Sequence, residues 1–123
     1  MPHLIIEYSY GLFADGDVDA TLQELNVALI ASGSIHKESD LRSRMRQLDA
    51  IRVGTEPGER GFIYAQLRML PGRTAAMRAE LSQRIAEVIF RRAARPKGMM
   101  VQMSVEVVEM ERESYVKEVL QSA

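Results

Sequence analysis

The chain contains no cysteine, and it has no long apolar run. Without cysteine it has no disulfide, no thiolate metal site and no cysteine nucleophile. Its apolar segment at residues 4–6 is interrupted at once by Glu7, and no basic region precedes it, so neither a membrane span nor a secretory signal peptide is predicted. We therefore expect a cytoplasmic protein that does not contact membranes.

A surplus of charge of one sign is also lacking. The 16 basic and 17 acidic residues give a formal net charge of -1, which provides no general attraction to nucleic acid. Any anionic ligand must therefore be bound by cations placed locally. The two histidines, His3 and His36, have no partner at metal-site spacing, and no zinc signature or glycine-rich phosphate loop is present. No metal site is predicted.

The 123 residues are enough for one hydrophobic core, and we expect residues 1–123 to form a single domain. Apolar residues recur at helical spacing in residues 18–32 and 74–94. Strand-like composition or alternation predicts four strands, over residues 3–8, 43–53, 61–70 and 99–110. A short helix or tail over residues 114–120 ends the chain.

The order strand, helix, strand occurs twice, which predicts an α+β fold of two consecutive βαβ units. Both helices can cover one face of a four-stranded mixed sheet in a two-layer domain. The other face mixes Met, Val and Leu with Gln, Arg and Glu, a composition better suited to a subunit interface than to bare solvent. We therefore expect a closed homo-oligomer.

Pro2 is the residue most informative about function. Removal of Met1 would turn its nitrogen into a free secondary amine at the head of a strand. An ordinary α-amino group has a pKa of roughly 7.7–8.0, and a neighbouring cation or a desolvating pocket lowers that pKa by disfavouring the ammonium form. Such an amine can take and return a proton at neutral pH. With Met1 in place, the same nitrogen is an amide and cannot.

Three arginines are candidates for binding a carboxylate substrate. Arg42 and Arg44 are two residues apart, so they project from one face of an extended segment. Arg73 follows a Pro-Gly turn at the start of a predicted helix, where backbone N–H groups also favour an anion. The planar guanidinium can bind a carboxylate through two hydrogen bonds. The ordinary alternatives are that these arginines are solvated surface charges and that Pro2 only shapes the chain terminus.

Three segments together resemble the tautomerase superfamily, and within it the 5-carboxymethyl-2-hydroxymuconate isomerases. They are residues 1–7 (Met-Pro-His-Leu-Ile-Ile-Glu), residues 41–44 (Leu-Arg-Ser-Arg) followed by Asp49, and residues 71–78, which begin Pro-Gly-Arg-Thr. Residues 104–106 are more loosely similar. The combination at these separations is fairly specific, whereas Met-Pro alone is weak.

The resemblance implies a homotrimer of doubled βαβ subunits, with active sites near the subunit boundaries and with no cofactor and no metal. It implies that the substrate is a small unsaturated carboxylate, the 2-hydroxymuconate dienol, which would become its 2-oxo isomer during degradation of homoprotocatechuate. Pro2 would be the catalytic base and acid. Arg42, Arg44 and Arg73 would bind or polarise the substrate.

Two alternatives remain open at this point. The chain could be a tautomerase of another 2-hydroxydienoate or of an arylpyruvate, or it could be a non-enzymatic module that binds a small molecule. The binding module predicts that Pro2→Ala leaves function intact, whereas the enzyme predicts a large loss of rate.

Overall fold

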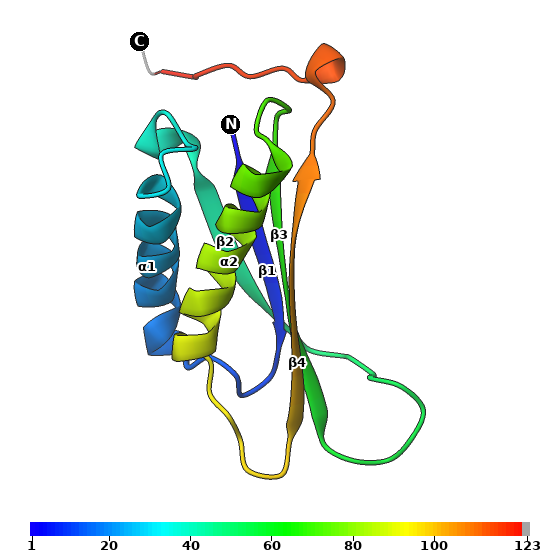
Figure 1. The fold of residues 1–123 in the computed structure, drawn as a ribbon. Helices are drawn as coiled ribbons and strands as arrows, with labels where there is room; N and C mark the ends of the chain where they lie inside the picture. Colours follow the sequence, from blue (N-terminus) through cyan, green and yellow to red (C-terminus); the bar gives the residue numbers. More distant parts are fainter. Residues whose placement is uncertain (122–123) are drawn as a thin grey trace.

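The computed structural model describes residues 1–121 and contains four strands and two α-helices (Figure 1). In chain order these are β1 (His3–Ser9), α1 (Val18–Ile30), β2 (Arg42–Leu48), β3 (Arg60–Met69), α2 (Ala75–Arg92) and β4 (Met100–Glu109). Three single turns of 3₁₀ helix accompany them: η1 (Asp15–Asp17), η2 (Glu38–Asp40) and η3 (Arg112–Ser114).

The strands form one mixed sheet in the order β2-β1-β3-β4. β1 runs parallel to β2, β3 runs parallel to β4, and the two central strands β1 and β3 are antiparallel. Figure 1 shows both helices on the same face of this sheet. The prediction of two consecutive βαβ units in a two-layer α+β fold is confirmed.

The core lies between the sheet and the helices because alternate strand residues are apolar. In β3, Ile63, Ala65 and Leu67 are buried, whereas the residues between them are only half-buried. From the helices, Leu25 and Ile85 are fully buried against this face. Each fully buried side chain of leucine or isoleucine size stabilises the fold by about 1.5–3 kcal/mol.

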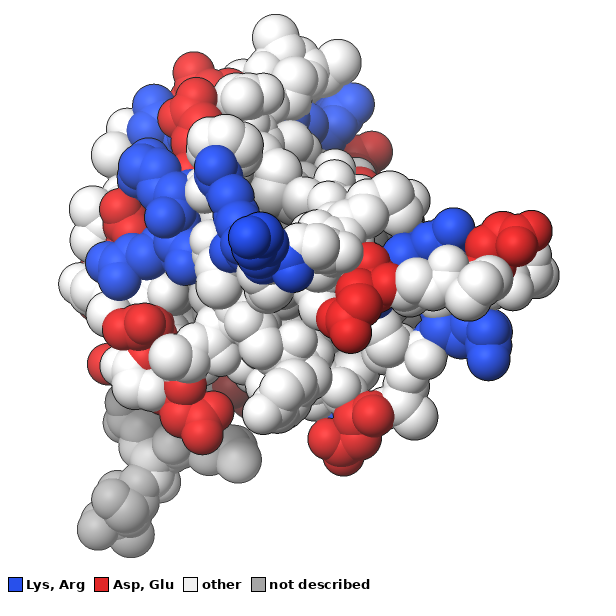
Figure 2. Space-filling model, turned by 90° about the horizontal axis from the view of Figure 1, so that it is seen from below, with Lys and Arg blue, Asp and Glu red and all other residues white. Residues whose placement is uncertain are grey.

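Specific contacts fix both ends of α2. The Thr74 hydroxyl oxygen accepts a hydrogen bond from the Met77 backbone N–H at 3.1 Å, which caps the first turn. In the last turn, Arg91 and Arg92 donate to the Glu24 carboxylate at 2.7 and 2.6 Å and so join α2 to α1. Figure 2 views this end of the molecule, where basic and acidic side chains are interspersed.

One predicted strand is longer than the structure has it. The strand expected over residues 43–53 ends at Leu48, because its neighbour β1 ends at Ser9 and the two residues are paired. Of the short helix or tail expected over residues 114–120, the structure shows the tail: after η3 the described chain has no regular structure. Val116 and Leu120 are 81% and 93% exposed, so a helix there would have no apolar surface to pack against.

The sheet face opposite the helices is uncovered in the single chain. Tyr64, Gln66 and Glu106 form a hydrogen-bonded row on it, with Tyr64 donating to Glu106 at 2.6 Å and accepting from Gln66 at 2.9 Å. Its apolar part comes from residues such as Ile5 and Phe62. Among the methionines, Met100 lies on this face as expected, whereas Met45 and Met103 have the parity that faces the helices.

No helix within residues 1–121 combines the length and the apolar character needed to cross a membrane.

Candidate active site

The sheet topology brings four separate segments to one edge. β1 and β2 begin at this edge, whereas β3 and β4, which run the other way, end there. Pro2, directly before β1, accepts a hydrogen bond at its carbonyl from the Arg42 backbone N–H at 3.2 Å. After the other two strands, Met110 N–H donates to Met69 O at 2.8 Å. Residues far apart in the sequence therefore meet at this edge.

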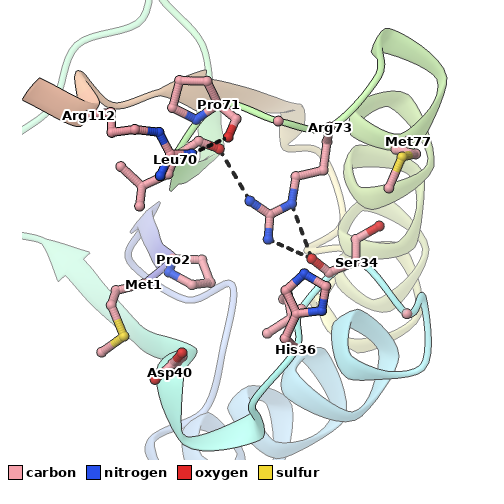
Figure 3. A pocket seen from close by; sticks show the side chains of 13 residues that line it. Met1, Pro2, Ser34, His36, Asp40, Leu70, Pro71, Arg73, Met77 and Arg112 are labelled. Carbon is pink, nitrogen blue, oxygen red and sulfur yellow. Dashed lines mark hydrogen bonds between the residues drawn. The ribbon is translucent and has the colours of Figure 1, made fainter.

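A cavity of about 480 Å³ opens at this edge (Figure 3). Its walls come from the chain start, the loop after α1, the turn between β3 and α2, and the segment after β4. The lining residues are Met1, Pro2, Gly33, Ser34, Ile35, His36, Asp40, Leu70, Pro71, Gly72, Arg73, Met77 and Arg112.

The chain start forms one wall of the cavity. Pro2 is buried and Met1 is half-buried. Burial lowers the pKa of the Met1 α-amino group from its ordinary value of 8.0; the negative charge of Asp40 opposes this, and the positive charges of Arg42, Arg73 and Lys117 add to it. An amine at this position is therefore neutral at lower pH than an ordinary chain terminus.

Arg42 lies beside the chain start. Its Nη2 donates to the Met1 carbonyl oxygen at 2.9 Å and to the Tyr115 hydroxyl at 3.4 Å. Its Nε is buried and has no hydrogen-bond partner among residues 1–121. Arg42 thus contacts Met1, which lines the cavity, and its Nε–H donates to no acceptor among residues 1–121.

Arg73 lies within the cavity, but its guanidinium is largely engaged. Nε and Nη2 donate to the Ser34 carbonyl oxygen at 3.1 and 2.7 Å, and Nη1 donates to the Leu70 carbonyl oxygen at 3.2 Å. An arginine has five N–H donors, and three of these groups are used here on backbone oxygens. Arg73 therefore ties the loop after α1 to the end of β3.

Arg44 lies apart from the other predicted site residues. It is exposed on the uncovered sheet face and does not line the cavity; its Nη1 contacts His3 Nδ1 at 3.0 Å. The structure therefore places Pro2 and Arg73 in the wall of the cavity and Arg42 behind it, in contact with Met1, whereas Arg44 lies away from the cavity.

The contact between His3 and Arg44 predicts a pH-dependent stability. Burial first, and then Arg42 and Arg44, lower the pKa of His3 from its ordinary value of 6.5. Below pH 6.5 the unfolded chain consequently binds more protons than the folded one, so stability falls with acidification through this window. We expect the urea unfolding midpoint to fall less between about pH 8 and about pH 5 in His3→Gln than in the wild type. An equal fall of the midpoint in the two proteins would contradict the role of His3 in this pH dependence.

Arg112 was not predicted from the sequence, although it lines the cavity and donates from Nη2 to the Pro71 carbonyl oxygen at 2.8 Å. A signal for it exists, because parallel strands end at the same edge of a sheet, so the residues that follow β3 and β4 must meet. It was missed because sequence spacing separates Arg112 from Pro71 by a whole helix and strand. In the part of the chain that the structure describes, no group of three His, Asp or Glu side chains is arranged to hold a metal ion.

Known proteins are similar to this chain in sequence pattern and in fold. The sequence model of a family described as 5-carboxymethyl-2-hydroxymuconate isomerase matches residues 2–121. No curated protein matches the chain in sequence. Among solved structures, a 5-carboxymethyl-2-hydroxymuconate isomerase from Deinococcus radiodurans R1 is similar with a TM-score of 0.77 and 23% identity, over 95% of this chain and 88% of that one.

More distant relatives share the same architecture. A macrophage migration inhibitory factor-like protein from Entamoeba histolytica has a TM-score of 0.68 and 13% identity, over 95% of both chains. A 5-carboxymethyl-2-hydroxymuconate delta-isomerase has a TM-score of 0.55 and 20% identity, over 97% of this chain and 88% of that one. At these identities the structural likeness shows the fold, while the family match covers nearly the whole sequence.

Proposed function

Because the chain belongs to the 5-carboxymethyl-2-hydroxymuconate isomerase family, and is thus an isomerase of the tautomerase superfamily, we propose that it converts 5-carboxymethyl-2-hydroxymuconate to its 2-oxo isomer through the amine of Pro2. The observation that carries the proposal is the position of Pro2, buried in the wall of a cavity whose surroundings lower the pKa of an amine. Family membership disfavours the non-enzymatic binding module.

The proposed reaction moves one proton within the substrate. The neutral Pro2 amine takes the proton of the 2-hydroxyl group, the electron pair forms the 2-oxo carbonyl, and the resulting ammonium returns a proton to a carbon of the diene. No atom is gained or lost. One group acts as base and then as acid, which requires a pKa near the working pH. The proline ring fixes the direction of the nitrogen and so keeps the reacting atoms aligned.

Removal of Met1 would prepare the site in two ways. It exposes the Pro2 nitrogen, and it removes the carbonyl oxygen to which Arg42 Nη2 donates at 2.9 Å. The freed guanidinium then lies next to the amine, where it can donate to a substrate oxygen that gains negative charge. Arg42 is therefore the predicted arginine that we place nearest to the reacting atoms.

Arg42→Gln is expected to lower kcat/KM for the proposed substrate by about 10-fold to 100-fold, the value of one lost hydrogen bond to a charged group. Stopped-flow ultraviolet absorbance of the dienol measures this. Arg46→Gln is the matched control, since Arg46 lies on the same face of β2 but is exposed and outside the cavity. Equal rates in the two variants would contradict the role of Arg42.

The substrate is tested by comparing dienols that carry different numbers of carboxylates. We use 'processed protein' for protein from which Met1 has been removed. We expect its kcat/KM to be highest for 5-carboxymethyl-2-hydroxymuconate, lower for 2-hydroxymuconate and lowest for the enol of phenylpyruvate. A higher kcat/KM for the arylpyruvate would favour the alternative tautomerase. Absence of acceleration for all three would reject the proposed reaction.

We also propose that the protein assembles as a homotrimer through the uncovered sheet face. Ile5 and Phe62 lie on this face beside Arg44 and Glu106, a mixture typical of surfaces between subunits. In such a trimer, Arg44 would contact substrate only if it lies against the cavity of a neighbouring subunit. Sedimentation velocity at micromolar concentration measures the assembly, and a monomer would contradict it.

A further inference from the structure

Two guanidinium groups in the cavity are anchored to consecutive carbonyl oxygens. Arg73 Nη1 donates to Leu70 O at 3.2 Å, and Arg112 Nη2 donates to Pro71 O at 2.8 Å. The two side chains come from different elements, one preceding α2 and one in η3 after β4, and Figure 3 shows them on either side of the Leu70–Pro71 segment. Because these two carbonyls belong to adjacent residues, both positive charges are held at the same wall.

Within residues 1–121, neither of these cations has an acidic partner, because every ion pair at 4.0 Å or less joins other residues. Asp40, the acidic residue that lines the cavity, is paired with Lys117 at 3.7 Å. Glu109, at the end of β4, is paired with Arg78 at 3.6 Å. Two like charges at one wall repel each other, and an anion bound between them would relieve that repulsion.

Arg73 and Arg112 differ in how many N–H donors remain free to bind a ligand. Arg73 uses three of its donor groups on backbone oxygens, whereas the side chain of Arg112 makes one hydrogen bond within residues 1–121, is exposed and lines the cavity. A guanidinium with most of its N–H donors free can bind a carboxylate through two parallel hydrogen bonds. Arg73 is better suited to fix the wall than to hold the ligand.

We propose that Arg112 binds a second carboxylate of the ligand, remote from the Pro2 amine, and that Arg73 is a positioning residue for this subsite. The inference rests on the proposed function, because it places one end of the substrate beside Arg42 and Pro2 and the other beside Arg112. It predicts a ligand with at least two carboxylates. A monocarboxylate would gain nothing from Arg112, so this residue determines specificity.

The test measures binding of two unreactive probes to the processed protein: tricarballylate, which carries three carboxylates, and butyrate, which carries one. We expect Arg112→Gln to weaken tricarballylate binding about tenfold and to change butyrate binding by less than about twofold. Arg112→Lys should give an intermediate value, because it keeps the charge and loses the planar fork. Arg95→Gln is the control; Arg95 stacks on Phe90, outside this cavity.

Kinetics with the proposed substrate give an independent result. Arg112→Gln should raise KM about tenfold and leave kcat within about twofold, because the remote carboxylate is bound equally in ground and transition states. Three results would overturn the inference: absence of tricarballylate binding by the wild type, equal binding by wild type and Arg112→Gln, or an equal loss of both probes. If Arg112→Gln selectively loses tricarballylate binding but the wild type has no isomerase activity, the inference stands and the proposed reaction fails.

Discussion

Protein that keeps Met1 should be inactive, and removal of Met1 from the same preparation should raise the rate of ketonisation about 1000-fold or more. With Met1 attached, the Pro2 nitrogen is an amide without a basic lone pair, so the general-base contribution of about 100-fold to 10,000-fold is lost. Met1 also forms part of the cavity wall, and its carbonyl oxygen accepts the hydrogen bond from Arg42 at 2.9 Å. A retained Met1 therefore blocks both the base and the neighbouring cation.

The experiment uses one batch released from an amino-terminal fusion so that Met1 is the first residue. Half is treated with methionine aminopeptidase, and intact mass confirms the loss of one methionine. The decay of the dienol absorbance is then measured for both halves. Circular dichroism of both halves controls for folding. Full activity before treatment would show that the Pro2 amine is not the base.

Pro2→Ala, also processed, should lower kcat for the dienol by about 100-fold. Alanine leaves a primary amine that can still take a proton, but it lacks the ring that fixes the nitrogen at the start of β1. The loss should therefore be smaller than that caused by a retained Met1. Pro57→Ala in the exposed loop before β3 is the matched control. A Pro2→Ala enzyme as fast as this control would contradict the role given to the proline ring, because the variant keeps an amine but loses the ring.

The architecture could be predicted from the sequence because its periodicity is strong. Alternation in β3 and the helical spacing of Leu81 and Ile85 match the buried faces that the structure places against each other. The end of β2 could not be predicted, because pairing with β1, rather than local composition, ends it at Leu48. Strand ends that depend on a distant partner leave little local signal.

The candidate site could be predicted only in part. Pro2 and Arg73 were proposed as site residues from their neighbours in the sequence, and both line the cavity. Arg112 has no local motif and reaches the cavity through the order of the strands. The engagement of Arg73 with backbone carbonyls also depends on the fold, because its acceptor Ser34 lies 39 residues earlier in the chain. Side-chain chemistry suggests candidates, but tertiary contacts decide which donors remain free.

The most direct test of the central claim is the pKa of Pro2 itself. In processed protein labelled with ¹⁵N-proline, the nitrogen shift of Pro2 is followed across pH beside kcat/KM for the dienol. The same surroundings that lower the pKa of the Met1 amine, burial and nearby cations, predict a Pro2 pKa below that of the same proline at the start of an unfolded peptide, with kcat/KM rising through the same pKa as the neutral amine forms. A Pro2 pKa at or above that of the unfolded peptide, or a rate profile that does not follow it, would contradict the assignment of Pro2 as the base.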